Sequence, residues 1–131
     1  SNNKLKLEGG GNSKRNFIYV DDVVNATYKI ALKGKKGESY HISSKEIISI
    51  KDLVKKVFKI SKSKKYNKNV HNTSERVGKD RIYFLNSNKL RKELNWRSKV
   101  NLDEGIKKTL VWFNQNKKKI IKSKKLYIHK K

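Results

Sequence analysis

The sequence contains no cysteine, no proline and no methionine. Without cysteine the chain can form neither a disulfide framework nor a thiolate metal site, and we expect a reducing compartment, the cytoplasm. No apolar run approaches the ~18 residues of a membrane helix, and no signal-like segment opens the chain. A start at Ser1 in place of methionine predicts a truncated or processed chain.

Acidic residues are scarce, and the 35 Lys and Arg against 11 Asp and Glu give a formal net charge of +24. Such a charge is typical of proteins that bind nucleic acid or anionic membranes. However, 30 of the basic residues are Lys and only 5 are Arg. Nucleic-acid readers favour Arg, whose fork makes bidentate contacts with bases and phosphates. A solvated, compositionally drifted surface is therefore the favoured interpretation, with no membrane or nucleic-acid partner expected.

A chain of 131 residues with 34% hydrophobic content is one domain or part of one. Helical spacing of apolar residues predicts a helix that is capped by Asp21 or Asp22 and ends at Gly34. Ser49-x-x-Asp52 and Asn101-x-x-Glu104 are capping boxes that predict two further helices. The second has an apolar stripe, ends near Asn116 and packs beside Trp96; the stripe is Leu102, Ile106, Thr109, Leu110 and Phe113.

Four short apolar runs, separated by these helices, predict strands or extended segments. They are Phe17–Val20, Ser39–Ser43, the surroundings of Val70, and Arg81–Leu85. A helix that is capped by Asn86 or Ser87 and ends near Asn95 follows the last run. Alternating short strands and helices indicate an α/β chain. The buried Val/Ile strand series of a central parallel sheet is missing.

Gly9–Gly11 is not a dinucleotide fingerprint, because these glycines precede a polar turn and a strand instead of opening a helix. They predict a tight turn. Helix capping explains Asp21 and Asp22 without a metal or an acid/base site. The scattered His41, His71 and His129 have no metal-ligand spacing, so no metal site is expected.

Three stretches together resemble the C-terminal part of nucleotide-sugar 4,6-dehydratases, NAD-dependent enzymes of the extended short-chain dehydrogenase/reductase superfamily. They are G-G-G-N-S-K-R-N-F-I-Y-V-D-D (9–22), E-R-V-G-K-D-R-I-Y-F-L-N-S-N-K-L-R-K-E-L-N-W (75–96) and D-E-G-I-K-K-T-L-V-W-F-N-Q-N (103–116). The resemblance implies an α/β fold: the C-terminal substrate-binding lobe of an extended Rossmann-type enzyme, with the Rossmann core missing. Residues 1–116 would form the nucleotide-sugar-binding lobe and 117–131 a mobile, Lys-rich tail.

The same resemblance implies which reaction the complete enzyme performs. A bound NAD oxidises the sugar at C4, water leaves across C5–C6, and hydride returns to C6; the usual substrate is dTDP-glucose. NAD would be bound by the missing half, through which the complete enzyme would form a homodimer. This chain would then have no catalytic or cofactor-binding residue of its own and be inactive alone. Tyr127 and Lys131 match the superfamily's Tyr-x-x-x-Lys spacing, but such a match is expected by chance in a Lys-rich tail.

The resemblance also implies which residues would bind substrate. Arg15 and Arg76 fall on the two arginines that the family places beside the nucleotide diphosphate, and Lys79 would add a positive charge near them. The chain departs from the family pattern at Val77, where Pro is common, and at Lys79, where His is common; the identity of the sugar nucleotide is therefore left open.

Other functions stay open at this point. A nucleotide-sugar 4-epimerase or a decarboxylase of the same superfamily shares part of the pattern, although G-K-D-R-I-Y at 78–83 favours a dehydratase. From different classes, the chain could be a basic nucleic-acid-binding module or a degenerate piece without an independent fold.

Overall fold

A computed structural model describes residues 4–123 of the chain. The elements follow in the order β1 (Leu5–Glu8), η1 (Gly9–Gly11), β2 (Lys14–Asn16), α1 (Val20–Lys33), β3 (Ile47–Ser49), α2 (Ile50–Ile60), α3 (Tyr66–Asn69), β4 (Val70–Thr73), β5 (Ile82–Tyr83), α4 (Asn88–Leu94) and α5 (Leu102–Lys122).

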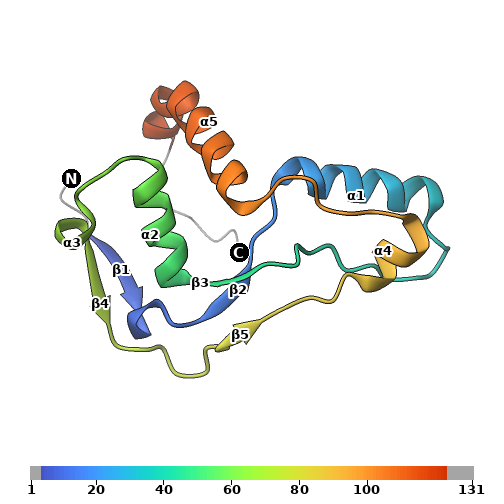
Figure 1. Cartoon of the computed structure of the whole chain (residues 1–131), viewed down its shortest axis with the longest axis horizontal. Coiled ribbons are helices and arrows are strands. Elements are labelled where there is room, and N and C mark those ends of the chain that lie inside the picture. Colours follow the sequence, from blue (N-terminus) through green and yellow to red (C-terminus); the bar gives the residue numbers. More distant parts are fainter. Residues whose placement is uncertain (1–3, 124–131) are drawn as a thin grey trace.

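The strands form two small sheets. β1 pairs with β4 in parallel, and β2 lies between an antiparallel β3 and a parallel β5. In Figure 1 α2 lies beside β1 and β4 at one end of the molecule, α1 and α4 lie at the other, and β2, β3 and β5 run between them. The result is a mixed α/β chain without a large central sheet.

The best-buried cluster lies between α1 and α4. Ala26, Leu90 and Trp96 are almost fully buried there together with Leu94. Trp96 is therefore an anchor, as predicted. The expectation that it packs beside α5 was wrong, because the cluster to which it belongs is formed by α1 and α4.

The carboxylate of Asp22 is buried and ties two distant segments together. Its two oxygens accept hydrogen bonds of 3.0 Å each from the backbone N–H groups of Lys99 and Val100. The residue at the N-cap of α1 is Tyr19, which has no side-chain capping bond. The prediction that Asp21 or Asp22 caps the helix was wrong: both lie in its first turn, and Asp22 holds the segment that leads into α5.

Both predicted capping boxes start a helix. The Ser49 side chain accepts a hydrogen bond of 3.0 Å from the N–H of Asp52, and the Asn101 side chain accepts one of 2.9 Å from the N–H of Glu104. α5 does not end near Asn116 as expected but continues to Lys122. The first part of the predicted tail is thus helical, and its last residues lie outside the described range.

α5 packs against α2 across an apolar cavity of about 290 Å³. Leu53 and Val57 from α2 and Ile106 and Leu110 from α5 lie in its wall. The predicted stripe of α5 is therefore partly confirmed, since Leu102, Ile106, Thr109 and Leu110 line this cavity, whereas Phe113 is 40% exposed. Lys56 of α2 and Asp103 of α5 form an ion pair of 2.5 Å beside it.

Two strand predictions differ from the structure. The strand expected near Phe17–Val20 lies earlier, at Lys14–Asn16, because that stretch finds ladder partners in β3 and β5. Ser39–Ser43 has no strand partner within residues 4–123 and is irregular. The strands expected near Val70 and within Arg81–Leu85 are confirmed as β4 and β5.

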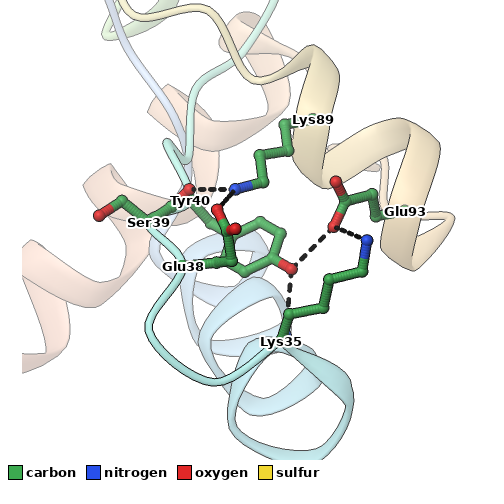
Figure 2. A network of polar contacts seen from close by, with 6 residues as sticks. All are labelled: Lys35, Glu38, Ser39, Tyr40, Lys89 and Glu93. Carbon is green, nitrogen blue, oxygen red and sulfur yellow. Dashed lines mark hydrogen bonds and ion pairs between the residues drawn. The ribbon is translucent and has the colours of Figure 1, made fainter.

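A polar network holds the start of this irregular segment against α4 (Figure 2). The Tyr40 hydroxyl donates a hydrogen bond of 2.9 Å to Glu93 and accepts one of 3.2 Å from the N–H of Lys35. Lys89 pairs with Glu38 and donates to the carbonyl of Ser39 at 3.2 Å. The connection between α1 and β3 is thereby fixed in place although it lacks secondary structure.

Candidate diphosphate-binding site

The glycine turn brings β1, β2 and the segment 74–81 together. All three glycines have positive φ, which are 57° at Gly9, 66° at Gly10 and 71° at Gly11. A Cβ on Gly9 would overlap the carboxylate of Glu75, and one on Gly11 would lie 2.9 Å from the backbone nitrogen of Lys51. Only glycine combines this backbone with such close approach. The predicted tight turn is confirmed.

Arg15 lies on β2 and contacts the end of the segment 74–81. One guanidinium nitrogen, Nη2, donates a hydrogen bond of 2.9 Å to the carbonyl of Asp80, and Nη1 donates one of 2.7 Å to the carbonyl of Lys14. The backbone N–H of Lys14 donates in turn to the carbonyl of Arg81 at 2.8 Å. Arg15 is thus connected to that segment through both its side chain and its strand.

Arg76 lies at the start of the same segment. It follows β4, whose last residue, Thr73, pairs with Glu8 at the end of β1. Arg76 is exposed, and no hydrogen bond or ion pair joins its guanidinium to another of residues 4–123. The parallel pairs β1–β4 and β2–β5 therefore hold both ends of the segment that carries Arg76 beside the turn that leads to Arg15.

Lys79 is used differently from the two arginines. Its ammonium group lies 3.0 Å from the carboxylate of Glu75 and 3.6 Å from that of Glu8, and its side chain is only 16% exposed. Two carboxylates offset its charge, and the contacts join the segment 74–81 to β1. Lys79 thus positions the segment in this structure.

A cavity of about 330 Å³, lined mostly by polar residues, lies next to the Arg15 strand. It is lined by Ser44, Lys45, Phe84, Asn86, Ser87, Asn88 and Arg91. It adjoins β2 because the Asn16 side chain donates to the carbonyl of Ser44 at 3.3 Å, while Phe84 follows β5 directly. Sequence reasoning missed Lys45 and Arg91 as lining residues. No local pattern marks them; the fold alone brings them together.

Other sequence candidates contribute little to this region. No cluster of three His, Cys, Asp or Glu side chains that could hold a metal ion occurs within the described residues. Tyr127, His129 and Lys131 lie outside them. Among residues 4–123 no helix is both long and apolar enough to cross a membrane.

Comparison with known proteins identifies this arrangement. The model of the family described as GDP-mannose 4,6 dehydratase matches residues 1–109. The chain belongs to this family. The human dTDP-D-glucose 4,6-dehydratase is 35% identical over 119 residues, which are 88% of this chain and 34% of the human protein. The resemblance to nucleotide-sugar 4,6-dehydratases seen in the sequence is therefore confirmed.

Solved structures of the family agree with the fold. The dTDP-glucose 4,6-dehydratase of Streptomyces venezuelae, solved with NAD bound, superimposes with a TM-score of 0.81 at 25% identity, covering 88% of this chain and 35% of the neighbour. The UDP-glucose 4-epimerase of Thermotoga maritima, solved with UDP-glucose, gives a TM-score of 0.78 at 30% identity, covering 88% of this chain and 36% of the neighbour. The chain thus has the fold of a dehydratase/epimerase part and spans about a third of the length of these relatives.

Proposed function

We propose that this chain binds the diphosphate of a nucleotide-diphosphate sugar, with dTDP-glucose as the favoured substrate, as the substrate-binding part of an NAD-dependent 4,6-dehydratase. The observation that carries the proposal is the hydrogen bond from Arg15 to the carbonyl of Asp80. It joins the first arginine to the segment that bears the second, Arg76, in a chain that has only 5 Arg.

The chemistry of the guanidinium group supports this role. Arg has five N–H donors in a planar fork that matches the oxygens of a phosphate, and two of the donors of Arg15 are used within the protein. The remaining donors of Arg15 and the exposed fork of Arg76 could bind one diphosphate from two sides. Lys79 supports them indirectly, by fixing the segment between Glu8 and Glu75.

In this proposal the nucleotide is held here so that its sugar reaches NAD in the other part of the fold. NAD supplies hydride acceptance and return when bound, and the binding energy of the diphosphate positions the sugar for it. We expect the isolated chain to bind no NAD and to turn over no nucleotide sugar. The complete enzyme would form its homodimer through the other part.

A 4-epimerase is the second candidate, since the Thermotoga maritima enzyme matches at 30% identity. Both candidates bind a nucleotide diphosphate, so the arginines do not separate them. The product separates them: a 4-keto-6-deoxy sugar nucleotide identifies a dehydratase, and an inverted C4 hydroxyl identifies an epimerase. The assay requires the complete enzyme.

Titration calorimetry of thymidine diphosphate into the full chain tests the diphosphate site. Arg15→Lys and Arg76→Lys keep the charge but remove the fork, and each should weaken binding by about 1–3 kcal/mol. Arg97→Lys is the matched control, because Arg97 is exposed and lies outside this site. If all three variants bind like the wild type, or if the wild type binds no thymidine diphosphate, the proposed site is wrong.

A further inference from the structure

The second half of α5 extends past the helix that it packs against. α5 has 21 residues and α2 has 11, and the α5 residues in the wall of their shared cavity end at Leu110. Residues 111–122 therefore continue for about 18 Å beyond this contact, at about 1.5 Å per residue. None of them is buried, and in Figure 1 they form the end of α5 at the upper edge of the molecule. We call residues 111–122 the outer end of α5.

Large apolar side chains gather on one side of this outer end. Trp112 is 56%, Phe113 40% and Ile121 58% exposed, and Ile120 is half-buried. Successive residues of a helix are about 100° apart, so these four side chains lie within one half of its circumference. An exposed indole is typical of binding surfaces, because its ring is apolar and its N–H is polar. We call Trp112, Phe113, Ile120 and Ile121 the outer apolar face.

Lysines occupy most of the remaining positions. Lys118 and Lys122 lie on the opposite side of the helix, and Lys119 lies at the border of the outer apolar face. Lys117 lies within that face, but a lysine stem can cover apolar surface while its ammonium group reaches past it. None of these four lysines forms an ion pair with another of residues 4–123. No Asp or Glu follows Glu104 in the sequence, so this charge is not offset along the helix.

An apolar face accompanied by lysines matches the boundary of a bilayer that contains anionic lipids. Helices of this kind lie in the plane of the boundary, with aromatic and aliphatic side chains among the headgroups and lysines near the phosphates. The lack of an apolar run of about 18 residues bears only on a helix that spans the bilayer, and not on one that lies along its surface.

Other occupants of this face fit less well. A second copy of this chain also has a net charge of +24 and would be repelled. Nucleic acid would pair its phosphates with the lysines but would leave Ile120 and Ile121 without apolar contacts. The match to the family model ends at residue 109, so the outer end of α5 lies outside the part that this family model describes.

We propose that the outer end of α5 binds the surface of a membrane that contains anionic lipids. The outer apolar face enters the headgroup region, and Lys117 and Lys119 beside it bind the lipid phosphates. Lys118 and Lys122 stay in water and add to the long-range attraction. The inference is independent of the proposed diphosphate site, which lies on β2 and the segment 74–81.

The test is sedimentation of the full chain with vesicles of phosphatidylcholine alone or of equal parts of phosphatidylcholine and phosphatidylserine. We expect the chain to sediment with the mixed vesicles only. Binding should also shift the fluorescence emission of Trp112 to the blue, because its indole leaves water. Trp96 is 1% exposed and contributes little to such a shift, so Trp112→Phe should remove it.

A pair of single variants tests the outer apolar face. Ile121→Gln should reduce binding to the mixed vesicles about tenfold, because one aliphatic side chain is no longer transferred out of water. Val24→Gln is the matched control: Val24 is 63% exposed on α1, and this variant should bind like the wild type.

A pair of double variants tests the lysines. Lys117→Gln combined with Lys119→Gln should reduce vesicle binding at least about tenfold, because both ammonium groups lie near the lipid phosphates. Lys33→Gln combined with Lys36→Gln removes the same charge from exposed positions at the end of α1 and just after it. This control should reduce binding less than about twofold, since charges distant from the surface are screened by salt.

Several outcomes would overturn the proposal. Equal losses in the two double variants would show that binding follows the net charge alone. Absence of binding to the mixed vesicles, or sedimentation without a blue shift of Trp112, would show that the outer apolar face stays in water. If duplex DNA shifts the Trp112 emission and mixed vesicles do not, the partner is a nucleic acid and the proposal is wrong. None of these results depends on thymidine diphosphate, so the two proposals fail separately.

Discussion

At the scale of single residues, the contact between Gly9 and Glu75 shapes the turn beside Arg15. A side chain at Gly9 meets two costs, a positive φ of 57° and overlap with a carboxylate that Lys79 holds at 3.0 Å. Gly9→Ala should lower the free energy of unfolding by about 1–3 kcal/mol, measured by urea denaturation. Gly37→Ala separates the two costs, because Gly37 has a φ of 80° with nothing within 4 Å of the added Cβ.

The difference in the free energy of unfolding between Gly9→Ala and Gly37→Ala measures the cost of the close approach to Glu75. It should disappear when Glu75→Ala is added to Gly9→Ala, since the carboxylate is the group that the new Cβ meets. Equal losses in Gly9→Ala and Gly37→Ala would show that backbone strain alone matters and that Glu75 moves aside without cost.

The buried carboxylate of Asp22 should contribute to stability through its two hydrogen bonds. Asp22→Ala would leave the part-buried N–H groups of Lys99 and Val100 without their acceptor in the protein. Each lost charge-assisted bond costs about 1.5–3 kcal/mol, so the loss of both should cost about 3–6 kcal/mol in chemical denaturation. Asp21→Ala is the matched control: it removes an exposed carboxylate from the same helix turn and should cost less than about 1 kcal/mol. Similar losses in both variants would mean that the stability comes from the interaction with the helix dipole and not from the hydrogen bonds of Asp22 to Lys99 and Val100.

At the scale of elements, the Lys56–Asp103 pair connects α2 to α5. The hydrogen bond from Lys56 lowers the pKa of Asp103 below its ordinary value of 3.8. A carboxyl with a lowered folded-state pKa contributes stability that is fully present above its unfolded pKa and is lost as pH falls through the folded value. The melting-temperature difference between wild type and Asp103→Asn should therefore be present at pH 6 and fade below about pH 3.8.

The same pair behaves in the opposite sense at alkaline pH. The hydrogen bond to Asp103 raises the pKa of Lys56 above its ordinary value of 10.5. The contribution of Lys56 to stability is therefore fully present below that value and is lost as pH rises through the folded-state pKa. Lys55→Met, an exposed neighbour on α2, should show neither dependence. A pH-independent difference between wild type and Asp103→Asn would show that the pair does not connect the helices energetically.

Elements with local signals were predictable, and elements that need a distant partner were not. Ser49 and Asn101 start their helices as expected because a capping box is satisfied within four residues. A strand requires a ladder, and Ser39–Ser43 has the pattern of a strand but no partner within residues 4–123. The end of α5 was misplaced because Lys is a good helix former, so a Lys-rich sequence need not end a helix.

At the scale of the whole molecule, the site could be predicted only as separate pieces. The resemblance selects Arg15, Arg76 and Lys79, but it does not show that Arg15 reaches Asp80 or that Glu8 and Glu75 hold Lys79. These contacts depend on the pairing of β1 with β4 and of β2 with β5, which join residues more than sixty positions apart. Lys45 and Arg91 were missed for the same reason.

The net charge of +24 predicts a general attraction to polyanions, which salt dependence can separate from binding at a specific anion site. Duplex DNA should bind to this Lys-rich surface without sequence preference, and its affinity should fall linearly with the logarithm of salt concentration, with a slope of about −0.9 for each phosphate neutralised. A small ligand held by two arginine forks neutralises few charges, so thymidine diphosphate should lose affinity much less steeply.

Calorimetry or fluorescence titration between 50 and 200 mM NaCl, roughly the range over which DNA-binding proteins lose most affinity, compares the two ligands. Arg76→Lys should leave DNA binding unchanged but weaken the binding of thymidine diphosphate, since only the diphosphate site needs the guanidinium fork. If thymidine diphosphate shows the steep slope and DNA binding proves sequence-specific, the surface has been selected for nucleic acid and the diphosphate assignment is wrong.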